Sequence, residues 1–347
     1  MKSIKDFNFT DKKVLVRCDF NVPIDEHGNI LDDFRIQKTL PTIKYLIKNK
    51  AKIILISHLG EPNGKIIPIL KLDKVKNRLE ELLNAPVIMA NDCIGEEVKK
   101  QILNLNQGDI LLLENLRFHK EETDNNLDFA KKLSELAEIY INDAFSDCHR
   151  KDASIVGIPA YLPSGAGLLL NNEIENLNKI LQNPAKPLVV IVGGIKVETK
   201  SKFIDKISEI ADFILVSGLI KKEILEKNLK FKHPEKIISP ADNLEALDIS
   251  DDTIKIFKEK ILTAKTVVWN GSFGKFEDEN YKKGTLAIAN AIIENGAFSL
   301  VGGGQTVEFL NKEGIISKFS HVSTGGGAML QYLSGDFLPG LKALIQG

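Results

Sequence analysis

Short apolar runs alternate with amphipathic stretches along the chain. In the first half, β-branched and aliphatic residues gather at 14–17, 52–57, 86–90, 109–114 and 138–143. Between these runs, stretches such as RIQKTLPTIKYLIKN and KVKNRLEELLN carry apolar residues three and four positions apart, which is the spacing of one helix face. Alternating strand and helix patterns predict a parallel sheet with helices on both faces.

The same pattern restarts in the second half, with apolar runs at 188–194, 212–218, 236–239, 266–271 and 298–304. Between the halves, the turn LPSGAG leads into the helix-like LLLNNEIENLNKIL and the Pro-marked loop QNPAKP. The predicted fold class is therefore α/β, with two doubly wound parallel-sheet domains and a cleft between them. We expect domains at 1–165 and 183–334, a hinge helix at 166–182, and a return of 335–347 to the first domain.

Composition narrows the class of protein. The 347 residues are 43% hydrophobic but contain no apolar run of the ~18 residues that a membrane span needs, and MKSIKDFNF lacks the apolar segment of a signal peptide. We therefore expect a cytoplasmic protein. The net charge of -1 argues against a nucleic-acid partner. The three cysteines lie far apart, so neither a zinc site nor a disulfide framework is expected, and nothing suggests more than a monomer.

Polar residues follow the strands of the first half, and ligands of open α/β sheets bind beyond the carboxyl ends of strands. The chain has only five arginines, all within its first 150 residues. The strand-end residues of this half are Arg17, Asp19, Asn21, His58, Arg117, His119, His149 and Arg150. Their convergence would form a basic pocket suited to a small polyanion. Arg78 lies inside a helix pattern and is expected on the surface.

Glycines follow the strands of the second half. The segments VGGIK (192–196), WNGSFG (269–274), VGGGQT (301–306) and STGGG (323–327) each place glycines where a strand gives way to a helix. Glycine lets the backbone approach a ligand closely, and the free amides of a helix N-terminus favour anions. A tight turn alone would explain one such pair, whereas four of them favour a nucleotide or polyphosphate site.

Common catalytic motifs are absent from the sequence. There is no G-x-x-x-x-G-K-[ST], no G-x-G-x-x-G after a strand, no H-E-x-x-H and no G-x-S-x-G. A P-loop enzyme and a dinucleotide-dependent oxidoreductase are therefore disfavoured.

The ordered motifs VRCDFNVP, DDFRIQKTLPTI, SHLGEP, LLENLRFH, INDAFSDCHR, VVIVGGIKVETK, TVVWNGSFGKFE, VGGGQTV and FSHVSTGGGA resemble those of phosphoglycerate kinases, from about residue 11 to the end. The resemblance implies an N-terminal domain that binds 3-phosphoglycerate, a C-terminal domain that binds MgADP or MgATP, and a hinge motion between them. The implied reaction is 1,3-bisphosphoglycerate + ADP = 3-phosphoglycerate + ATP, with Mg²⁺ bound to the nucleotide.

The resemblance also implies roles for individual residues. The expected phosphoglycerate ligands are Asp19, Asn21, Arg35, His58, Arg117 and Arg150. The expected nucleotide-binding residues are Gly194, Lys196, Lys200, Glu277, Gly303, Gly304, Gln305 and Thr306. Phosphoryl transfer depends on positioning and charge neutralisation, so we expect Arg35, Lys196 and the amides at Gly325 and Gly326 to contact the transferred group.

Several positions depart from the family pattern. Glu61 stands where an arginine is usual and should weaken phosphoglycerate binding unless Lys65 turns inward to compensate. Gln305 replaces an aspartate associated with the metal-nucleotide, Ser146, Asp147 and Cys148 replace small residues, and residues 216–224 have lost glycines. These changes keep open a second interpretation, a nucleotide-binding paralogue with little or no kinase activity and a regulatory role.

Some assignments also have structural alternatives. Asp19 and Asn21 could cap a turn, Lys200 could be a solvated helix residue, and His119 and His149 could be structural.

Overall fold

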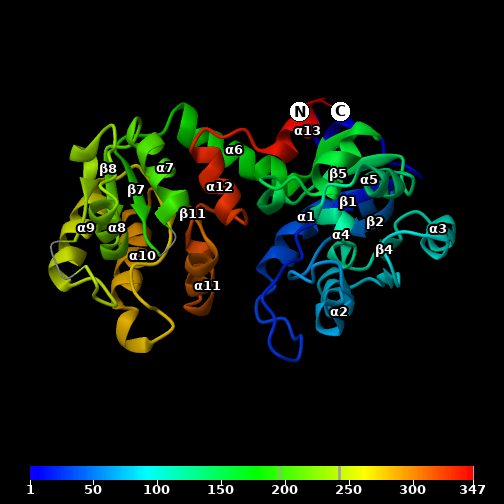
Figure 1. The fold of residues 1–347 in the computed structure, drawn as a ribbon, viewed down its shortest axis with the longest axis horizontal. Helices are drawn as coiled ribbons and strands as arrows, with labels where there is room; N and C mark the ends of the chain where they lie inside the picture. The colour runs from blue at the N-terminus through cyan, green and yellow to red at the C-terminus, as the bar shows by residue number, and fades with distance from the viewer. Residues whose placement is uncertain (195–196, 241–243, 347) are drawn as a thin grey trace. The chain divides into compact units, whose positions relative to one another are not determined.

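The computed structural model describes residues 1–194, 197–240 and 244–346. The chain divides into two compact units, one of Met1–Glu173 with Phe337–Gly347 and the other of Ile174–Asp336. Each unit is a parallel sheet with helices on both faces (Figure 1). The prediction of a two-domain α/β fold is confirmed.

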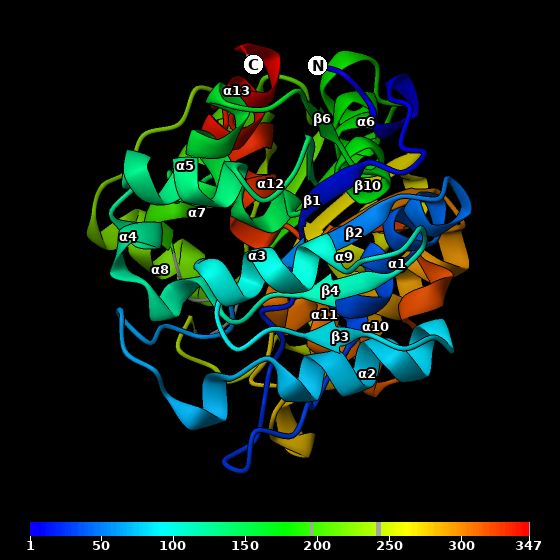
Figure 2. The ribbon, with the colours of Figure 1, turned by 90° about the vertical axis from the view of Figure 1, so that its right-hand side faces the viewer.

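The sheet of the first unit has six strands in the order β3-β4-β2-β1-β5-β6, and the view in Figure 2 faces this unit. Its strands are β1 (Lys13–Arg17), β2 (Lys52–Ile56), β3 (Ile88–Met89), β4 (Ile110–Leu112), β5 (Ile139–Asn142) and β6 (Ser164–Ala166). Its helices are α1 (Phe34–Lys48), α2 (Asp73–Leu83), α3 (Glu96–Leu103), α4 (Lys120–Thr123), α5 (Leu127–Ser134) and α13 (Pro339–Gln346).

The sheet of the second unit also has six parallel strands, in the order β12-β11-β10-β7-β8-β9. Its strands are β7 (Leu188–Val192), β8 (Phe213–Val216), β9 (Ile237–Ile238), β10 (Thr266–Asn270), β11 (Phe298–Gly302) and β12 (His321–Val322). Its helices are α7 (Val197–Ser208), α8 (Gly218–Glu226), α9 (Asp251–Thr263), α10 (Lys283–Asn295), α11 (Gly304–Lys312) and α12 (Gly326–Leu333). The helix α6 (Leu168–Gln182) contains the boundary between the units.

Helices on both faces explain why the central strands are almost wholly apolar. Every residue of β7 and of β10 is buried. A strand that is covered on both faces has no solvent side, so its sequence shows a continuous apolar run rather than alternation. This is the pattern that made these strands visible in the sequence.

Each sheet has a switch point at its first strand, because the next strands of the chain are added on one side of it and later strands are added on the other side. In the first unit β1 pairs with β2 on one side and β5 on the other, and in the second unit β7 pairs with β8 and β10. The crevice beyond the carboxyl ends of the strands at such a point is the usual ligand site of doubly wound sheets. The loops after β1, β5, β7 and β10 are therefore where ligands are expected to bind.

One detail differs from the sequence-based expectation. The segment Ser164–Ala166, predicted as a turn, is strand β6 and pairs with Tyr140–Asn142 of β5. Arg78 lies at the surface, where its Nε donates to Asp33 Oδ2 at 2.7 Å.

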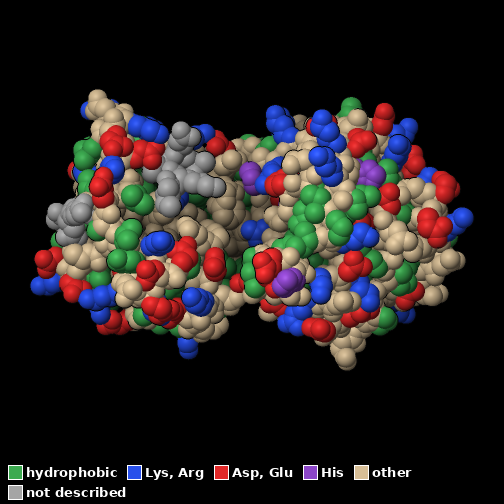
Figure 3. Space-filling model, turned by 60° about the horizontal axis from the view of Figure 1, so that its bottom comes forward, with side chains coloured by type: hydrophobic (Ala, Val, Ile, Leu, Met, Phe, Trp, Pro, Cys, Tyr) green, Lys and Arg blue, Asp and Glu red, His purple; other side chains and the backbone are tan. Residues whose placement is uncertain are grey.

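The two ends of the described chain lie side by side in the first unit (Figures 1 and 2). Ala166 N donates to Lys2 O, and Gly340 N at the start of α13 donates to Cys148 O. On the face drawn in Figure 3, basic and acidic side chains are interspersed over each unit. None of the described helices is both long and apolar enough to cross a membrane.

Candidate active site

The predicted phosphoglycerate residues lie in the loops beyond the strand ends of the first unit. Asp19 and Asn21 follow β1, His58 follows β2, Arg117 follows β4, and Arg150 follows β5. Arg35 comes from a different kind of element, the first turn of α1. The parallel sheet thus gathers residues that are up to 131 positions apart in sequence, counting from Asp19 to Arg150.

Asp19 organises the first part of this group. Its side chain is 1% exposed, and its Oδ2 accepts from Arg35 Nη1 at 2.8 Å and from Ser146 Oγ. Its Oδ1 accepts from Asn21 N at 3.0 Å, so Asp19 also shapes the turn after β1. Asn21 in turn accepts from Gly60 N at 2.9 Å. The carboxylate therefore directs the guanidinium of Arg35, and Ser146, one of the departures from the family pattern, is part of the same contact.

Arg117 and Glu61 form the second part. Arg117 is 1% exposed, and its Nη1 lies 2.7 Å from Glu61 Oε1 and 3.0 Å from Gly60 O. Its Nη2 lies 3.3 Å from Asp152 Oδ2. Arg150 Nη2 lies 3.8 Å from the same Oε1 of Glu61. The same carboxylate oxygen of Glu61 therefore lies near both arginines.

The predicted basic pocket is thus partly neutralised by the chain's own carboxylates. Lys65, which we expected to compensate for Glu61, has an exposed side chain. Arg17 does not line the pocket: its side chain is fully buried behind His58, and its Nη2 lies 3.0 Å from His58 Nδ1.

His58 is an uncharged side chain in this setting. Burial lowers its pKa well below the usual value, and the neighbouring charges of Arg17 and Arg117 lower it further. Its Nε2 has no hydrogen-bond partner among the described residues and is buried. A buried ring nitrogen without a partner is available to a ligand.

His119 lies apart from these residues. Its Nε2 lies 2.6 Å from Asp92 Oδ1, and this hydrogen bond raises its pKa. Together with Cys93 these two side chains form the one group of described residues that could surround a metal ion. However, burial raises the pKa of the Cys93 thiol well above its usual value, and a thiolate is the form that binds metals. Asp92 and His119 already satisfy each other, so we regard this pair as structural.

His149 is half-buried, and burial lowers its pKa. Its Nδ1 has no hydrogen-bond partner among the described residues.

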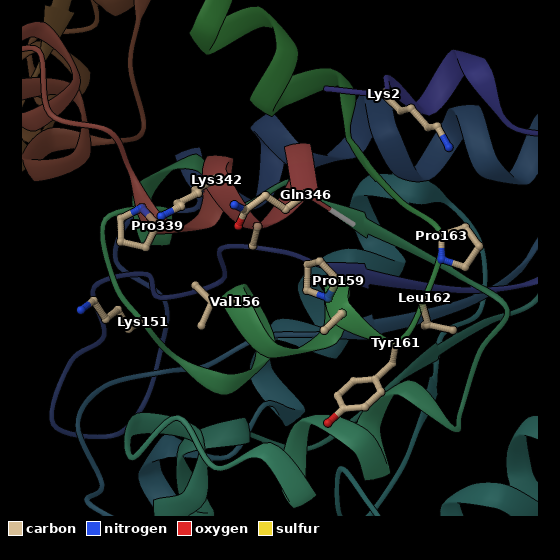
Figure 4. A pocket seen from close by; sticks show the side chains of 12 residues that line it. Lys2, Lys151, Val156, Pro159, Tyr161, Leu162, Pro163, Pro339, Lys342 and Gln346 are labelled. Atoms are coloured by element: carbon tan, nitrogen blue, oxygen red, sulfur yellow. The ribbon is translucent and has the colours of Figure 1, made fainter.

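A cavity of about 760 Å³ lies elsewhere in the first unit, beside α13 and residues 156–163. It contains none of the predicted ligand residues. Its basic side chains are Lys2, Lys151 and Lys342, and the ammonium group of Lys2 points away from those of Lys151 and Lys342 (Figure 4). Because an anion site needs cations that converge, this cavity lacks the geometry of one.

The second unit has a cavity of about 480 Å³ beyond the carboxyl ends of β7, β8 and β10. It brings together three of the predicted nucleotide residues, Gly194, Glu277 and Gln305. Gln305 Nε2 donates to Glu277 Oε1 at 3.4 Å. The other lining residues are Ser217, Leu219, Glu245, Ala246, Leu247, Ser272, Phe273, Gly274 and Lys275. Ser217 and Leu219 belong to the segment that has lost glycines, yet they still line a cavity.

Two glycine turns meet at the switch point of this sheet. Gly193 N donates to Asn270 O at 2.9 Å, and Gly194 N donates to Ser272 O at 2.7 Å. A Cβ on Gly193 would lie 2.2 Å from Ser272 O and 2.4 Å from Gly271 O. Only glycine allows the backbones after β7 and β10 to touch in this way.

The remaining predicted residues of this unit have varied environments. Lys200 is 7% exposed and its Nζ donates to Gly193 O, so it is not a solvated helix residue. Thr306 is fully buried and its Oγ1 accepts from Gly271 N at 2.9 Å, so its side chain supports the turn. Gly303 and Gly304 open α11 and are partly or fully exposed. Lys196 lies outside the described residues.

The glycines of STGGGA form the entry to α12. Gly325 N donates to Ser323 Oγ at 3.1 Å, so this amide is occupied, in contrast to our expectation for Gly325. Gly326 and Gly327 are the first two residues of α12, where backbone amides lack partners within the helix. A Cβ on Gly326 would lie 3.8 Å from the Cα of Gly303, so the turns before α11 and α12 are neighbours.

Some candidate residues were not predicted. Asn270 ends β10, is 4% exposed, and its Nδ2 has no hydrogen-bond partner among the described residues. Its position at a strand end, inside the segment WNGSFG, could have identified it as a candidate from the sequence. Phe273 and Leu247 line the cavity, but their participation depends on how distant loops pack.

Comparison with known proteins gives one consistent answer. The family profile described as phosphoglycerate kinase matches residues 4–233 and 220–336. A curated protein named phosphoglycerate kinase from Chlorobium phaeobacteroides is 41% identical over 392 aligned positions, covering 99% of each chain. One with the same name from Dictyoglomus turgidum is 42% identical and covers 98% of this chain and 97% of its own. The first alignment is longer than the 347-residue chain, so this chain has gaps relative to that protein.

Solved structures agree. The phosphoglycerate kinase from Pyrococcus horikoshii superposes with a TM-score of 0.90 at 31% identity, covering 99% of this chain and 98% of its own. The enzyme from Coxiella burnetii gives a TM-score of 0.80 at 33% identity with the same coverage.

Proposed function

The chain belongs to the phosphoglycerate kinase family, and from this premise we propose how its residues carry out the family's reaction. The reaction is the reversible phosphoryl transfer 1,3-bisphosphoglycerate + ADP = 3-phosphoglycerate + ATP, in glycolysis and gluconeogenesis. The protein is a phosphotransferase with a carboxyl group as acceptor.

The first unit binds the phosphoglycerate. Arg35, directed by Asp19, and the pair Arg117 and Arg150 supply positive charge, while Asn21 and His58 supply polar contacts. The position of Glu61 supports this assignment most directly. Its carboxylate lies on Arg117 and beside Arg150, which indicates that these guanidinium groups can hold an anion. The substrate has to displace Glu61 to use them.

The second unit binds the nucleotide. We assign the adenosine to the cavity of about 480 Å³, with the carboxylate of Glu277 as acceptor for ribose hydroxyls. The phosphates are assigned to the glycine turns before α11 and α12, where helix amides point toward the ligand. Lys200, held close to Gly193, adds positive charge at the same edge of the sheet.

The transferred group needs charge neutralisation rather than a protein nucleophile. Arg35 from the first unit and Lys196 from the second are our candidates for direct contact. The amides of Gly326 and its neighbour Gly327 complete the set, since that of Gly325 is occupied by Ser323. Closure of the two units would exclude water, which would otherwise hydrolyse the acyl phosphate.

Magnesium is proposed to arrive with the nucleotide. In proteins Mg²⁺ is commonly bound through one or two side-chain oxygens together with substrate phosphates and water. Among the described residues, no group of three ligands gathers at the nucleotide cavity, and the carboxylate and amide oxygens among its lining residues are those of Glu245, Glu277 and Gln305. This small donor set fits a metal held mainly by the nucleotide. When bound, Mg²⁺ would neutralise phosphate charge.

A coupled assay of 1,3-bisphosphoglycerate formation from ATP and 3-phosphoglycerate tests the proposal. We expect turnover, and we expect Lys196→Ala to lower kcat about a hundredfold or more, as loss of one transition-state donor does elsewhere. Binding of MgADP without turnover would instead support the second interpretation, a nucleotide-binding paralogue with a regulatory role, which the changes at Glu61 and Gln305 leave open.

We also propose that the enzyme acts as a monomer in the cytoplasm, where glycolysis takes place. Gel filtration of the purified protein at several concentrations tests the first part, and fractionation of cells tests the second.

A further inference from the structure

A buried chain of hydrogen bonds runs behind His58. It starts at Arg17, the last residue of β1, whose side chain has no exposed surface. It continues through Ser154, in the helical turn Ala153–Gly157, to Glu122 on α4. Both Ser154 and Glu122 are also fully buried. Nothing in the proposed reaction uses these three side chains directly, so their role needs another explanation.

Every nitrogen of the Arg17 guanidinium is engaged. Nε donates to Ser154 Oγ at 2.9 Å, and Nη1 donates to Cys18 O. Nη2 lies 3.0 Å from His58 Nδ1 and 3.1 Å from Asp147 Oδ2. A planar group held at all three nitrogens has a fixed orientation.

The contact between Arg17 and His58 determines where the imidazole carries its proton. A guanidinium has donors and no acceptor, so Nδ1 of His58 must present its lone pair to Nη2. A neutral imidazole with an accepting Nδ1 carries its proton on Nε2. That is the ring nitrogen without a partner among the described residues. His58 is therefore prepared to donate one hydrogen bond from Nε2.

Ser154 and Glu122 fix the other side of Arg17. Because Ser154 Oγ accepts from Arg17, its own proton is free to go to Glu122 Oε1, which lies 2.5 Å away. Ser154 N donates to Glu122 Oε2 at 2.9 Å. The Ser154 carbonyl accepts from Tyr140 OH at 2.7 Å. The serine is thus held by four hydrogen bonds, and its hydroxyl links the buried carboxyl group of Glu122 to the guanidinium of Arg17.

We propose that Arg17, held in place by Ser154 and Glu122, is a positioning residue that fixes His58 as the neutral tautomer with its proton on Nε2. The proposal deepens the proposed function, because it takes the ligand of His58 to be the phosphoglycerate. His58 then meets this anion as a donor whose direction is set before binding, without the cost of burying another charge.

The electrostatics around the ring agree with a neutral His58. The charged groups near it are Arg17, Arg117, Arg150, Asp19 and Asp147. Three are cationic, and together with burial they hold the pKa of His58 well below its usual value. Asp147 Oδ2 lies 3.6 Å from Nδ1, which is beyond a hydrogen bond, so it does not compete with Arg17 for that nitrogen.

The first test needs no activity. Nitrogen-15 NMR of the histidine rings in the ligand-free protein distinguishes the two neutral tautomers and the imidazolium, and His58→Gln identifies the His58 signals by their loss. We expect the Nε2–H tautomer at neutral pH, with no imidazolium signal there. A ring with its proton on Nδ1, or an imidazolium at neutral pH, would overturn the proposal even if the enzyme is fully active.

The second test removes one link of the chain. Ser154→Ala deletes only the hydroxyl that Arg17 and Glu122 share. We expect the KM for 3-phosphoglycerate to rise about five- to tenfold, as loss of one well-placed hydrogen bond does, with the KM for ATP unchanged. The His58 signals should also broaden or show both tautomers. The matched control is Ser164→Ala, which deletes another buried serine hydroxyl of the same unit, one that donates to Leu162 O.

One outcome of this second test would contradict the proposed role of Ser154 in positioning His58. If Ser154→Ala and Ser164→Ala leave the His58 signals and the substrate KM equally unaffected, the chain of hydrogen bonds does not position His58. If the protein proves to have no kinase activity, the NMR result still decides the tautomer, so failure of the proposed function and failure of this inference remain distinguishable. Arg17→Lys, where it folds, should shift the His58 signals more than Ser154→Ala does.

Discussion

The two proposed binding regions are built from different parts of the polypeptide. In the first unit the proposed ligand side is built largely from charged side chains held in ion pairs, some partly exposed, such as Arg35 with Asp19, and some buried, such as Arg117 with Asp152. In the second unit it is built from backbone at glycine turns and from a cavity with apolar walls. In our proposal, recognition in the first site depends on the balance of charges, whereas in the second site it depends on how closely two backbone segments approach.

The largest expected effect is on the charge balance of the first unit. Arg117→Met leaves the carboxylate of Asp152 buried without its partner, and breaking a buried pair in this way typically costs about 3 to 5 kcal/mol. Urea denaturation should report this loss. The matched control is Arg78→Met, whose arginine pairs at the surface with Glu81 and Asp33 and should cost about 1 kcal/mol or less. Equal losses in the two variants would contradict the comparison.

The corresponding change in the second unit acts on the backbone. Gly193→Ala places a Cβ 2.2 Å from Ser272 O, so β7 and β10 must separate at their carboxyl ends. We expect a loss of about 1 to 3 kcal/mol in stability, typical of overpacking, and weaker MgADP binding. Thermal unfolding and calorimetry measure the two. At Gly304 a Cβ meets nothing within 4 Å, so the fold of Gly304→Ala should be as stable as the wild type.

The pH dependence of stability should also differ between the units. Burial raises the pKa of Asp143, in the first unit, to about 7, although its Oδ1 accepts from the amides of Leu169 and Leu170 in α6. In the unfolded chain the Asp143 carboxyl group loses its proton near pH 3.9. Between about that pH and about pH 7, the folded state therefore holds a proton that the unfolded state lacks. As a result, the free energy of unfolding decreases as the pH rises to about 7.

Asp143→Asn should remove this decline. Between about pH 5 and pH 7, the wild type should lose roughly 2 kcal/mol of stability relative to the variant. Urea unfolding at both pH values is the measurement. Burial raises the pKa of Asp248 in the second unit too, but that side chain is only half-buried, so Asp248→Asn should change the slope less. A larger effect from Asp248 would reverse the comparison.

The smallest effect concerns Glu61. Glu61→Gln removes the carboxylate that competes with the substrate for Arg117 and Arg150. We expect the KM for 3-phosphoglycerate to fall about three- to fivefold, about 1 kcal/mol, with kcat and the KM for ATP nearly unchanged. Steady-state kinetics decide this, with Glu97→Gln, an exposed position on α3, as the control. A rise in KM would show that Glu61 helps to hold the substrate.

The sequence predicted most of the fold because the signals of buried parallel strands are local. The runs at 188–192 and 266–270 are apolar at most positions, so no tertiary information was needed to find β7 and β10. Strand β6 was missed because Ser, Gly and Ala carry no strand preference, and its pairing with β5 is a tertiary effect.

The site was predicted less completely, for a related reason. Strand-end position identified His58 and Arg117, but it gave no signal for Ser154, which contacts Arg17 from a turn, or for Glu122, which contacts Ser154 from a helix. Likewise, the sequence showed that Glu61 reverses a charge, but not that its carboxylate would lie on Arg117. Side-chain pairing across loops depends on the folded geometry.

The adjacent chain ends have a consequence for the order in which the protein is made. The first unit needs α13, the last helix of the chain, whereas the second unit is one uninterrupted segment, Ile174–Asp336. Domains fold as they emerge during synthesis. The second unit can therefore finish folding while the first, though begun earlier, still waits for its final helix to leave the ribosome. The domain that is started first is completed last.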